Sequence, residues 1–197
     1  MKTLIIIVLA ALSANAQESV KQVAHYKSET IAGFTAQLPD PNYSPGAENP
    51  DITQATIGDT TCNPHWSTKS IRPPASYTNK LKREQMIAYG DTVPQIPPLG
   101  NPPDVSKCIA HSNDPHCYEE DHIISLEGGG HPRDPKNLMP QPYYPRPGAH
   151  EKDAVENLLF GKPRGLVCSG KMSLVDAQKA IKTDWLAVWV KHIGPTK

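Results

Sequence analysis

The sequence lacks three features that mark large classes of protein: an excess of one charge, a long apolar run beyond its first residues, and closely spaced cysteine pairs. Its 20 Lys and Arg balance its 20 Asp and Glu, which gives no overall attraction for a polyanion but leaves room for a local basic face. After residue 12, no segment approaches the roughly 20 apolar residues of a membrane-spanning helix. We therefore expect no membrane partner, and the sequence does not indicate the oligomeric state.

The first sixteen residues have the three parts of a secretory signal peptide. Lys2 supplies the positive end, residues 4–12 form the apolar run, and small residues ending at Ala16 form an A-x-A cleavage site. We expect cleavage after Ala16 and a mature protein that is secreted or periplasmic.

An even number of cysteines in an oxidising compartment favours disulfides over free thiols. No Cys-x-x-Cys pair is present, which leaves a structural zinc site as the weaker alternative. The loop between Cys108 and Cys117 is the shortest that a bridge could close. By elimination, we predict a second bridge between Cys62 and Cys168, which would join two distant parts of the chain.

Proline is abundant, at 21 of 197 residues, and this disfavours long helical bundles and solenoids. Residues 17–60 carry a formal charge of −4 and scattered prolines, which predicts an extended, partly disordered arm. Residues 61–197 carry a charge of +3 and are expected to form the folded domain.

The spacing of apolar residues predicts three helices, at about 78–89, 149–160 and 174–191. The first helix has basic residues on its polar side, which we interpret as solvated rather than as phosphate contacts: Lys80, Lys82 and Arg83. The third begins with a capping box at Ser173. We assign the two tryptophans of this helix, Trp185 and Trp189, to the core rather than to base stacking.

Residues 118–130 carry the strongest chemical signal. Asp121 and His122 stand at the head of an expected short strand, Ile123–Leu126, which runs into a glycine turn. A second extended piece around residues 137–139 can return beside it, and the helix from about 149 would pack across the hairpin. This arrangement predicts a compact pocket for a metal ion and a phosphate.

The residue types in this segment suit hydrolysis of a phosphodiester. The Asp121 carboxylate is a hard oxygen ligand for Mg²⁺, which keeps waters and substrate phosphate oxygens in its shell. The His122 imidazole can accept a proton from an attacking water near neutral pH. The amide of Asn137 can hold a loop or orient the histidine ring.

The pattern resembles the HNH nucleases of the His-Me finger (ββα-metal) superfamily. The matching residues are Asp121-His122, fourteen intervening residues, Asn137-Leu138, a glycine turn, and a helix containing Lys152. Several longer stretches are similar to a group of exported bacterial HNH-like proteins: WSTKSIRPPASYTNKLK, DHIISLEGGG, PKNLMPQPY, KDAVENLL, VCSGKMSL and AQKAIKTDW. The resemblance covers about residues 60–190.

The resemblance implies an α+β fold, in which a small ββα-metal finger at about 118–160 is flanked by additional helices. It also implies a metal-dependent endonuclease in which Asp121 binds the metal, His122 is the general base and Asn137 braces the loop. The helix ligand of the family falls on Arg146 or Ala149, neither of which binds metals, so His150 is the nearest candidate for a second ligand.

The expected activity is hydrolysis of DNA, with RNA as a second candidate substrate, using Mg²⁺ or a similar divalent ion such as Mn²⁺. The alternative is an exported, disulfide-stapled binding protein that keeps the finger fold without catalysis. The neutral charge and the displaced helix ligand favour this alternative, and the intact Asp121-His122 pair favours the enzyme.

Overall fold

A computed structural model describes residues 26–89, 108, 114–142 and 149–194. The expected signal peptide, 1–16, and the start of the arm lie outside these ranges. The helices and strands are β1 (Tyr26–Ile31), β2 (Phe34–Pro39), α1 (Ala75–Ala88), β3 (Tyr118–His122), β4 (Leu138–Pro142), α2 (Ala149–Phe160) and α3 (Leu174–His192). Short 3-10 turns complete the order: η1 (Thr68–Ser70), η3 (Pro115–Cys117), η4 (Leu126–Gly128) and η5 (Pro135–Asn137). This composition confirms the mixed α+β class.

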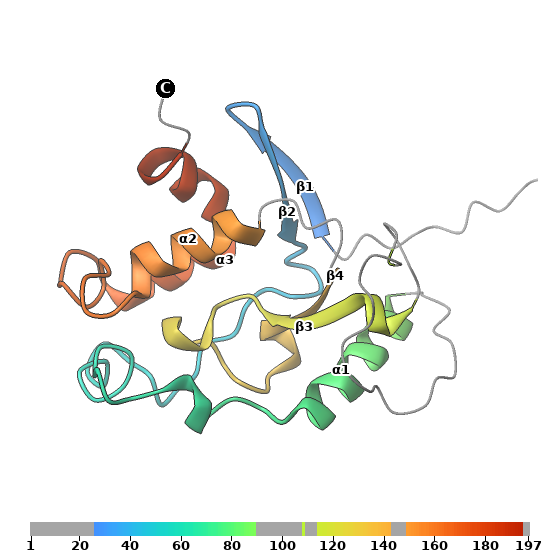
Figure 1. Cartoon of the computed structure of the whole chain (residues 1–197), viewed down its shortest axis with the longest axis horizontal. Helices are drawn as coiled ribbons and strands as arrows, with labels where there is room; N and C mark the ends of the chain where they lie inside the picture. Colours follow the sequence, from blue (N-terminus) through green and yellow to red (C-terminus); the bar gives the residue numbers. More distant parts are fainter. Residues whose placement is uncertain (1–25, 90–107, 109–113, 143–148, 195–197) are drawn as a thin grey trace, which may run out of the picture.

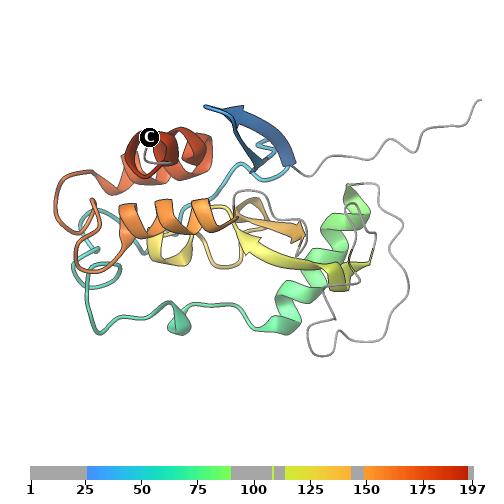
Figure 2. The same ribbon diagram turned by 45° about the horizontal axis from the view of Figure 1, so that its top comes forward.

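The described residues form two antiparallel hairpins and three helices. β1 pairs with β2, and β3 pairs with β4 so that His122 lies opposite Leu138. The β3–β4 hairpin lies between α1 and the pair formed by α2 and α3 (Figures 1 and 2). We expected α2 to cover this hairpin, but α1 packs on its strands, whereas α2 packs against α3 and η4.

The main core lies between α2, α3 and the β1–β2 hairpin. Its largest members include Phe160, Trp185 and Ile181, all nearly inaccessible to solvent. Trp189 is half-buried and stacks on Phe34 with ring centroids 4.6 Å apart. Both tryptophans therefore serve packing, as the sequence predicted.

The C-terminal helix begins where the capping box placed it. The Ser173 hydroxyl oxygen accepts from the Asp176 amide at 3.1 Å and donates to its carboxylate at 2.6 Å. The helix is kinked at Asp184, whose backbone is not helical and whose side chain caps the following turn at Ala187. The apolar spacing continues across the kink, so periodicity alone did not reveal it.

The prediction of an extended arm over 17–60 is wrong for the part that the structure describes. β1 and β2 form a hairpin against α3, and Ala36, Leu38 and Ile52 are buried in the main core. The segment around Glu48 also pairs with Gly130 of the glycine turn. The proline-rich, acidic composition of this segment masks its few apolar residues, which are sufficient because α2 and α3 supply most of the core.

Both predicted disulfides are present, Cys62–Cys168 and Cys108–Cys117, and neither free thiols nor a cysteine zinc site remains. Such bridges persist in oxidising, extracellular-type compartments. Within the described ranges, no helix has the length and apolarity needed to cross a bilayer.

Polar side chains of α1 bind the backbone of the β3–β4 hairpin. The Lys82 ammonium donates to the Tyr118 carbonyl at 2.6 Å, and the Gln85 amide donates to the carbonyls of Pro135 and Leu138. Lys82 is buried, so our interpretation of it as a solvated residue is wrong, although Lys80 is exposed. A lysine can lie in an interface when its ammonium reaches a backbone carbonyl that would otherwise lack a donor.

A carboxylic acid, Glu120, is buried beneath α1. Neither of its carboxylate oxygens has a hydrogen-bond partner among the described residues. Burial raises the pKa of Glu120 to about 9, although the nearby Lys82 ammonium opposes the shift. The side chain is therefore protonated in the folded protein at neutral pH, whereas in the unfolded chain it is ionised above about pH 4.5.

The raised pKa predicts a stability that falls with rising pH. The folded state holds a proton that the unfolded state releases, so this contribution is complete below about pH 4.5 and is lost progressively toward pH 9. We expect Glu120 to make the free energy of urea unfolding on the order of 4 kcal/mol lower at pH 8 than at pH 5, and Glu120→Gln to remove most of this slope. The exposed Glu127→Gln should retain it. If the unfolding free energies of wild type and Glu120→Gln change with pH in the same way, Glu120 does not have a raised pKa in the folded protein.

Candidate functional site

Asp121 and His122 lie at the end of β3, not at the head of a strand as we expected. The strand ends because the backbone partner on β4 is replaced by a side chain: the Ile124 amide donates to Asn137 Oδ1 at 2.9 Å. The apolar run after His122 instead enters the interior, with Ile123 and Ile124 nearly inaccessible, and then turns through η4. The expected strand at Ile123–Leu126 is therefore wrong, because the segment leaves the sheet after His122 and enters the core.

Asn137 joins the two ends of this turn. Its Nδ2 donates to the carbonyls of Ile124 and His131, each at 3.0 Å, and its side chain has no exposed surface. The amide thus uses both of its donors and its acceptor on backbone groups. Asn137 fixes the geometry of the loop that follows the Asp121-His122 pair.

Glycine is required in the turn after η4, because the backbone there passes very close to the Ile124 carbonyl. A Cβ at Gly130 would lie 1.9 Å from the Ile124 carbonyl oxygen, and Gly129 adopts a positive φ of 75°. A side chain at position 130 would therefore displace the residues that Asn137 holds.

The His122 ring is held by a carbonyl from the loop after the glycine turn. His122 Nε2 lies 3.2 Å from the Pro132 carbonyl oxygen. Because a carbonyl can only accept, Nε2 carries the proton in the neutral ring, and the lone pair is on Nδ1. The flanking carbonyls are also bound, that of His131 by Asn137 and that of Arg133 by the Tyr77 hydroxyl at 2.5 Å. Three consecutive carbonyls of this loop thus each accept from a side chain.

Burial lowers the pKa of His122, and the Arg72 and Lys152 cations lower it further against the opposing effects of Pro132 and Asp121. Only 7% of the residue is exposed. The imidazole is therefore neutral at pH 7 and can accept a proton there.

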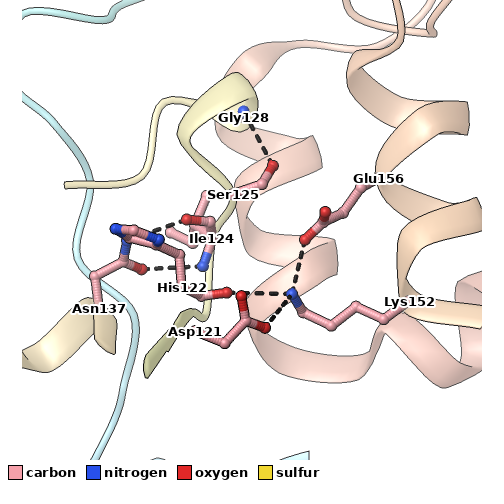
Figure 3. A network of polar contacts seen from close by, with 8 residues as sticks. All are labelled: Asp121, His122, Ile124, Ser125, Gly128, Asn137, Lys152 and Glu156. Carbon is pink, nitrogen blue, oxygen red and sulfur yellow. Dashed lines mark hydrogen bonds and ion pairs between the residues drawn. The ribbon is translucent and has the colours of Figure 1, made fainter. Parts of the chain in front are cut away.

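Asp121 belongs to a partly buried ionic network with α2. The Lys152 ammonium lies 2.8 Å from a Glu156 oxygen and 3.5 Å from Asp121 Oδ2, and it donates to the His122 carbonyl at 3.1 Å. Figure 3 shows the ammonium between the two carboxylates. Lys152 thus ties α2 to the end of β3.

The ammonium of this network stays charged. Burial alone would lower the pKa of Lys152, but the carboxylates of Asp121 and Glu156 hold it above its usual value. Burial also raises the pKa of Glu156, an effect that the ammonium opposes. The network therefore places a fixed positive charge beside Asp121.

His150, the expected second metal ligand, lies in the first turn of α2 and is exposed. No described contact joins it to Asp121, and the described residues contain no group of three or more His, Cys, Asp or Glu placed to hold a metal ion. Asp121 is about one-third exposed, and its Oδ1 has no hydrogen bond among the described residues. This donor set fits an ion held by one carboxylate together with water and substrate oxygens, which is the manner in which Mg²⁺ often binds.

Comparisons with family models, curated proteins and solved structures found no match. Functional assignment therefore depends on the geometry of the site itself.

Sequence reasoning missed three residues that hold the site. Glu156 pairs with Lys152 at a spacing of four residues, a helical signal that was available in the sequence. Tyr77 and His131 gave no such signal, because their partners are backbone groups. His131 Nδ1 accepts from the amides of Arg133 and Asp134, so its side chain shapes the loop.

Proposed function

We propose that this protein is an exported, metal-dependent endonuclease that hydrolyses phosphodiester bonds of DNA, and of RNA as a second substrate. One observation carries the proposal: a buried neutral imidazole, His122, has its Nε2 fixed by a carbonyl and adjoins a carboxylate at the end of β3. In this proposal, β3, β4 and α2 are the ββα finger of an HNH nuclease, and residues 1–16 are the export signal.

In the proposed reaction, His122 Nδ1 accepts a proton from a water that attacks the phosphorus, and the 3′ oxygen departs. Asp121 would hold Mg²⁺ or Mn²⁺, with His150 as the candidate second ligand. A bound divalent ion supplies neutralisation of the charge that develops on the phosphate and the leaving oxygen. Asn137 and the Pro132 carbonyl keep the imidazole oriented, and Lys152 positions Asp121 through its charge.

A binding protein without catalysis is the second candidate. It is favoured by the Lys152 ammonium, which already neutralises the Asp121 carboxylate, and by the exposed position of His150. A site of this kind could keep the fold while making no use of a metal.

Plasmid nicking separates the two candidates. The purified protein should convert supercoiled plasmid to the relaxed form with Mg²⁺ or Mn²⁺ and lose this activity in EDTA. Asp121→Asn should require more metal for half-maximal activity. If His150 is the second ligand, His150→Ala should do the same, and an unchanged metal requirement in that variant would exclude it. An absence of nicking with every divalent ion tested would reject the enzyme and leave the binding protein.

A further inference from the structure

A hollow of about 340 Å³ is lined in part by the loop that holds His122. Its lining includes Ser70 and Ile71, Pro132 and Arg133, and also Asn49 and Asp51. Its volume is at the lower end of the range for small-ligand sites, which begins at about 300 Å³. The Pro132 residue that lines it is the one whose carbonyl binds His122 Nε2, so one loop both lines the hollow and holds the proposed base.

Two exposed arginines belong to the segments that line this hollow. Arg133 lines it, and its backbone is fixed because its carbonyl accepts from Tyr77. Arg72 follows Ile71 directly in the chain, and its positive charge contributes to lowering the pKa of His122. Neither arginine forms an ion pair with another described residue, so both guanidinium groups are available to an anion.

The hollow is not uniformly basic, because Asp51 also lines it. The backbone of Asp51 is held by Asn49 Oδ1 and by the Thr56 hydroxyl, whereas its carboxylate has no partner in the described part of the chain. A bare phosphate would be repelled by this carboxylate. A nucleotide suits both charges, since its phosphate can meet the arginines and the amino group of its base can donate to the carboxylate.

We propose that this hollow is a subsite for one nucleotide next to the bond that is cleaved, with its phosphate bound by Arg72 and Arg133. The base lies against the apolar surfaces of Ile71 and Pro132, and Asp51 accepts from its exocyclic amino group. The subsite favours cytosine over thymine, which has no such amino group, and an unpaired strand, because a base within a duplex cannot enter the hollow. This inference rests on the proposed function and identifies the preferred substrate of the same site.

Binding of fluorescent single-stranded hexanucleotides in EDTA tests the subsite without cleavage. We expect Arg72→Gln and Arg133→Gln each to weaken binding of the cytosine hexamer about three- to tenfold and to reduce the salt slope by about 0.7. Lys191→Gln, which removes a charge from the exposed end of α3, is the control and should change little. Asp51→Asn should abolish the preference for the cytosine over the thymine hexamer.

Three results would overturn the subsite. They are an equal loss of hexamer affinity in Arg72→Gln, Arg133→Gln and Lys191→Gln, a preference for duplex, and failure to bind the hexamers. These results are separate from the nicking assay. If binding depends on the arginines but no nicking occurs, the nuclease is rejected and the nucleotide subsite is retained. If nicking occurs but neither arginine affects binding, the subsite is rejected and the nuclease is retained.

Discussion

Replacement of His122 by alanine should lower the rate of plasmid nicking by about two to four orders of magnitude, the range that a positioned general base contributes. The reason is that only the proton acceptor is lost, since the proposed metal ligand, Asp121, keeps its contact with Lys152. Half-maximal activation by Mg²⁺ or Mn²⁺ should therefore stay close to the wild-type concentration while the maximal rate falls.

His116→Ala is a matched control for this variant. The His116 imidazole lies outside the site and pairs with Asp114 at 2.9 Å, so its removal deletes the same type of ring without touching the proposed base. Because the His122 ring also contributes a hydrogen bond to Pro132, thermal unfolding of both variants should accompany the assay. Full metal-dependent activity in a folded His122→Ala protein would exclude His122 as the base.

Loss of the long disulfide should destabilise the protein more than loss of the short one. Cys62 and Cys168 are separated by 106 residues, whereas Cys108 and Cys117 are separated by 9. In the chain-entropy model, bridges closing loops of these lengths contribute on the order of 4 kcal/mol and about 2.5 kcal/mol, respectively. Urea unfolding of the two double Cys→Ser variants, with wild type alongside, measures both values under identical conditions.

The segments joined by the long bridge also meet through non-covalent contacts. The Lys162 ammonium donates to the carbonyls of Asn63 and Trp66 and lies 5.0 Å from the centre of the Trp66 ring. These contacts can hold the native arrangement after the bridge is removed, so the Cys62→Ser, Cys168→Ser protein should still fold, with a lower midpoint. A larger loss for the short bridge would show that native-state contacts, rather than loop entropy, determine the effect.

Helix positions and cysteine pairing could be predicted from the sequence because both follow from local pattern or simple counting. The expected helices at 149–160 and 174–191 agree with α2 and α3 to within one residue at each end. α1 begins three residues before the expected start, because Ala75 follows the two prolines directly and Pro74 occupies the cap position.

The site was predicted less completely, because many of its contacts join residues that are far apart in the sequence. Asp121, His122 and Asn137 were found from their residue types and spacing, and they do lie together at the end of β3. The buried state of Lys82 and the partnership of Tyr77 with Arg133 depend on how α1 packs on the hairpin, which no local pattern encodes. The same is true of the hairpin at 26–39, whose apolar residues are too few to indicate a core without α3.

Because the carbonyls of residues 131–133 are all hydrogen-bonded, this loop is already ordered before any substrate binds. Each is fixed by a side chain from elsewhere in the fold, so the conformational entropy of this loop is lost during folding and not when a substrate arrives. The orientation of His122 is consequently set in the unliganded protein. In the proposed nuclease, binding free energy is then available for holding the substrate in a reactive geometry, because little of it is consumed in reorganising the protein.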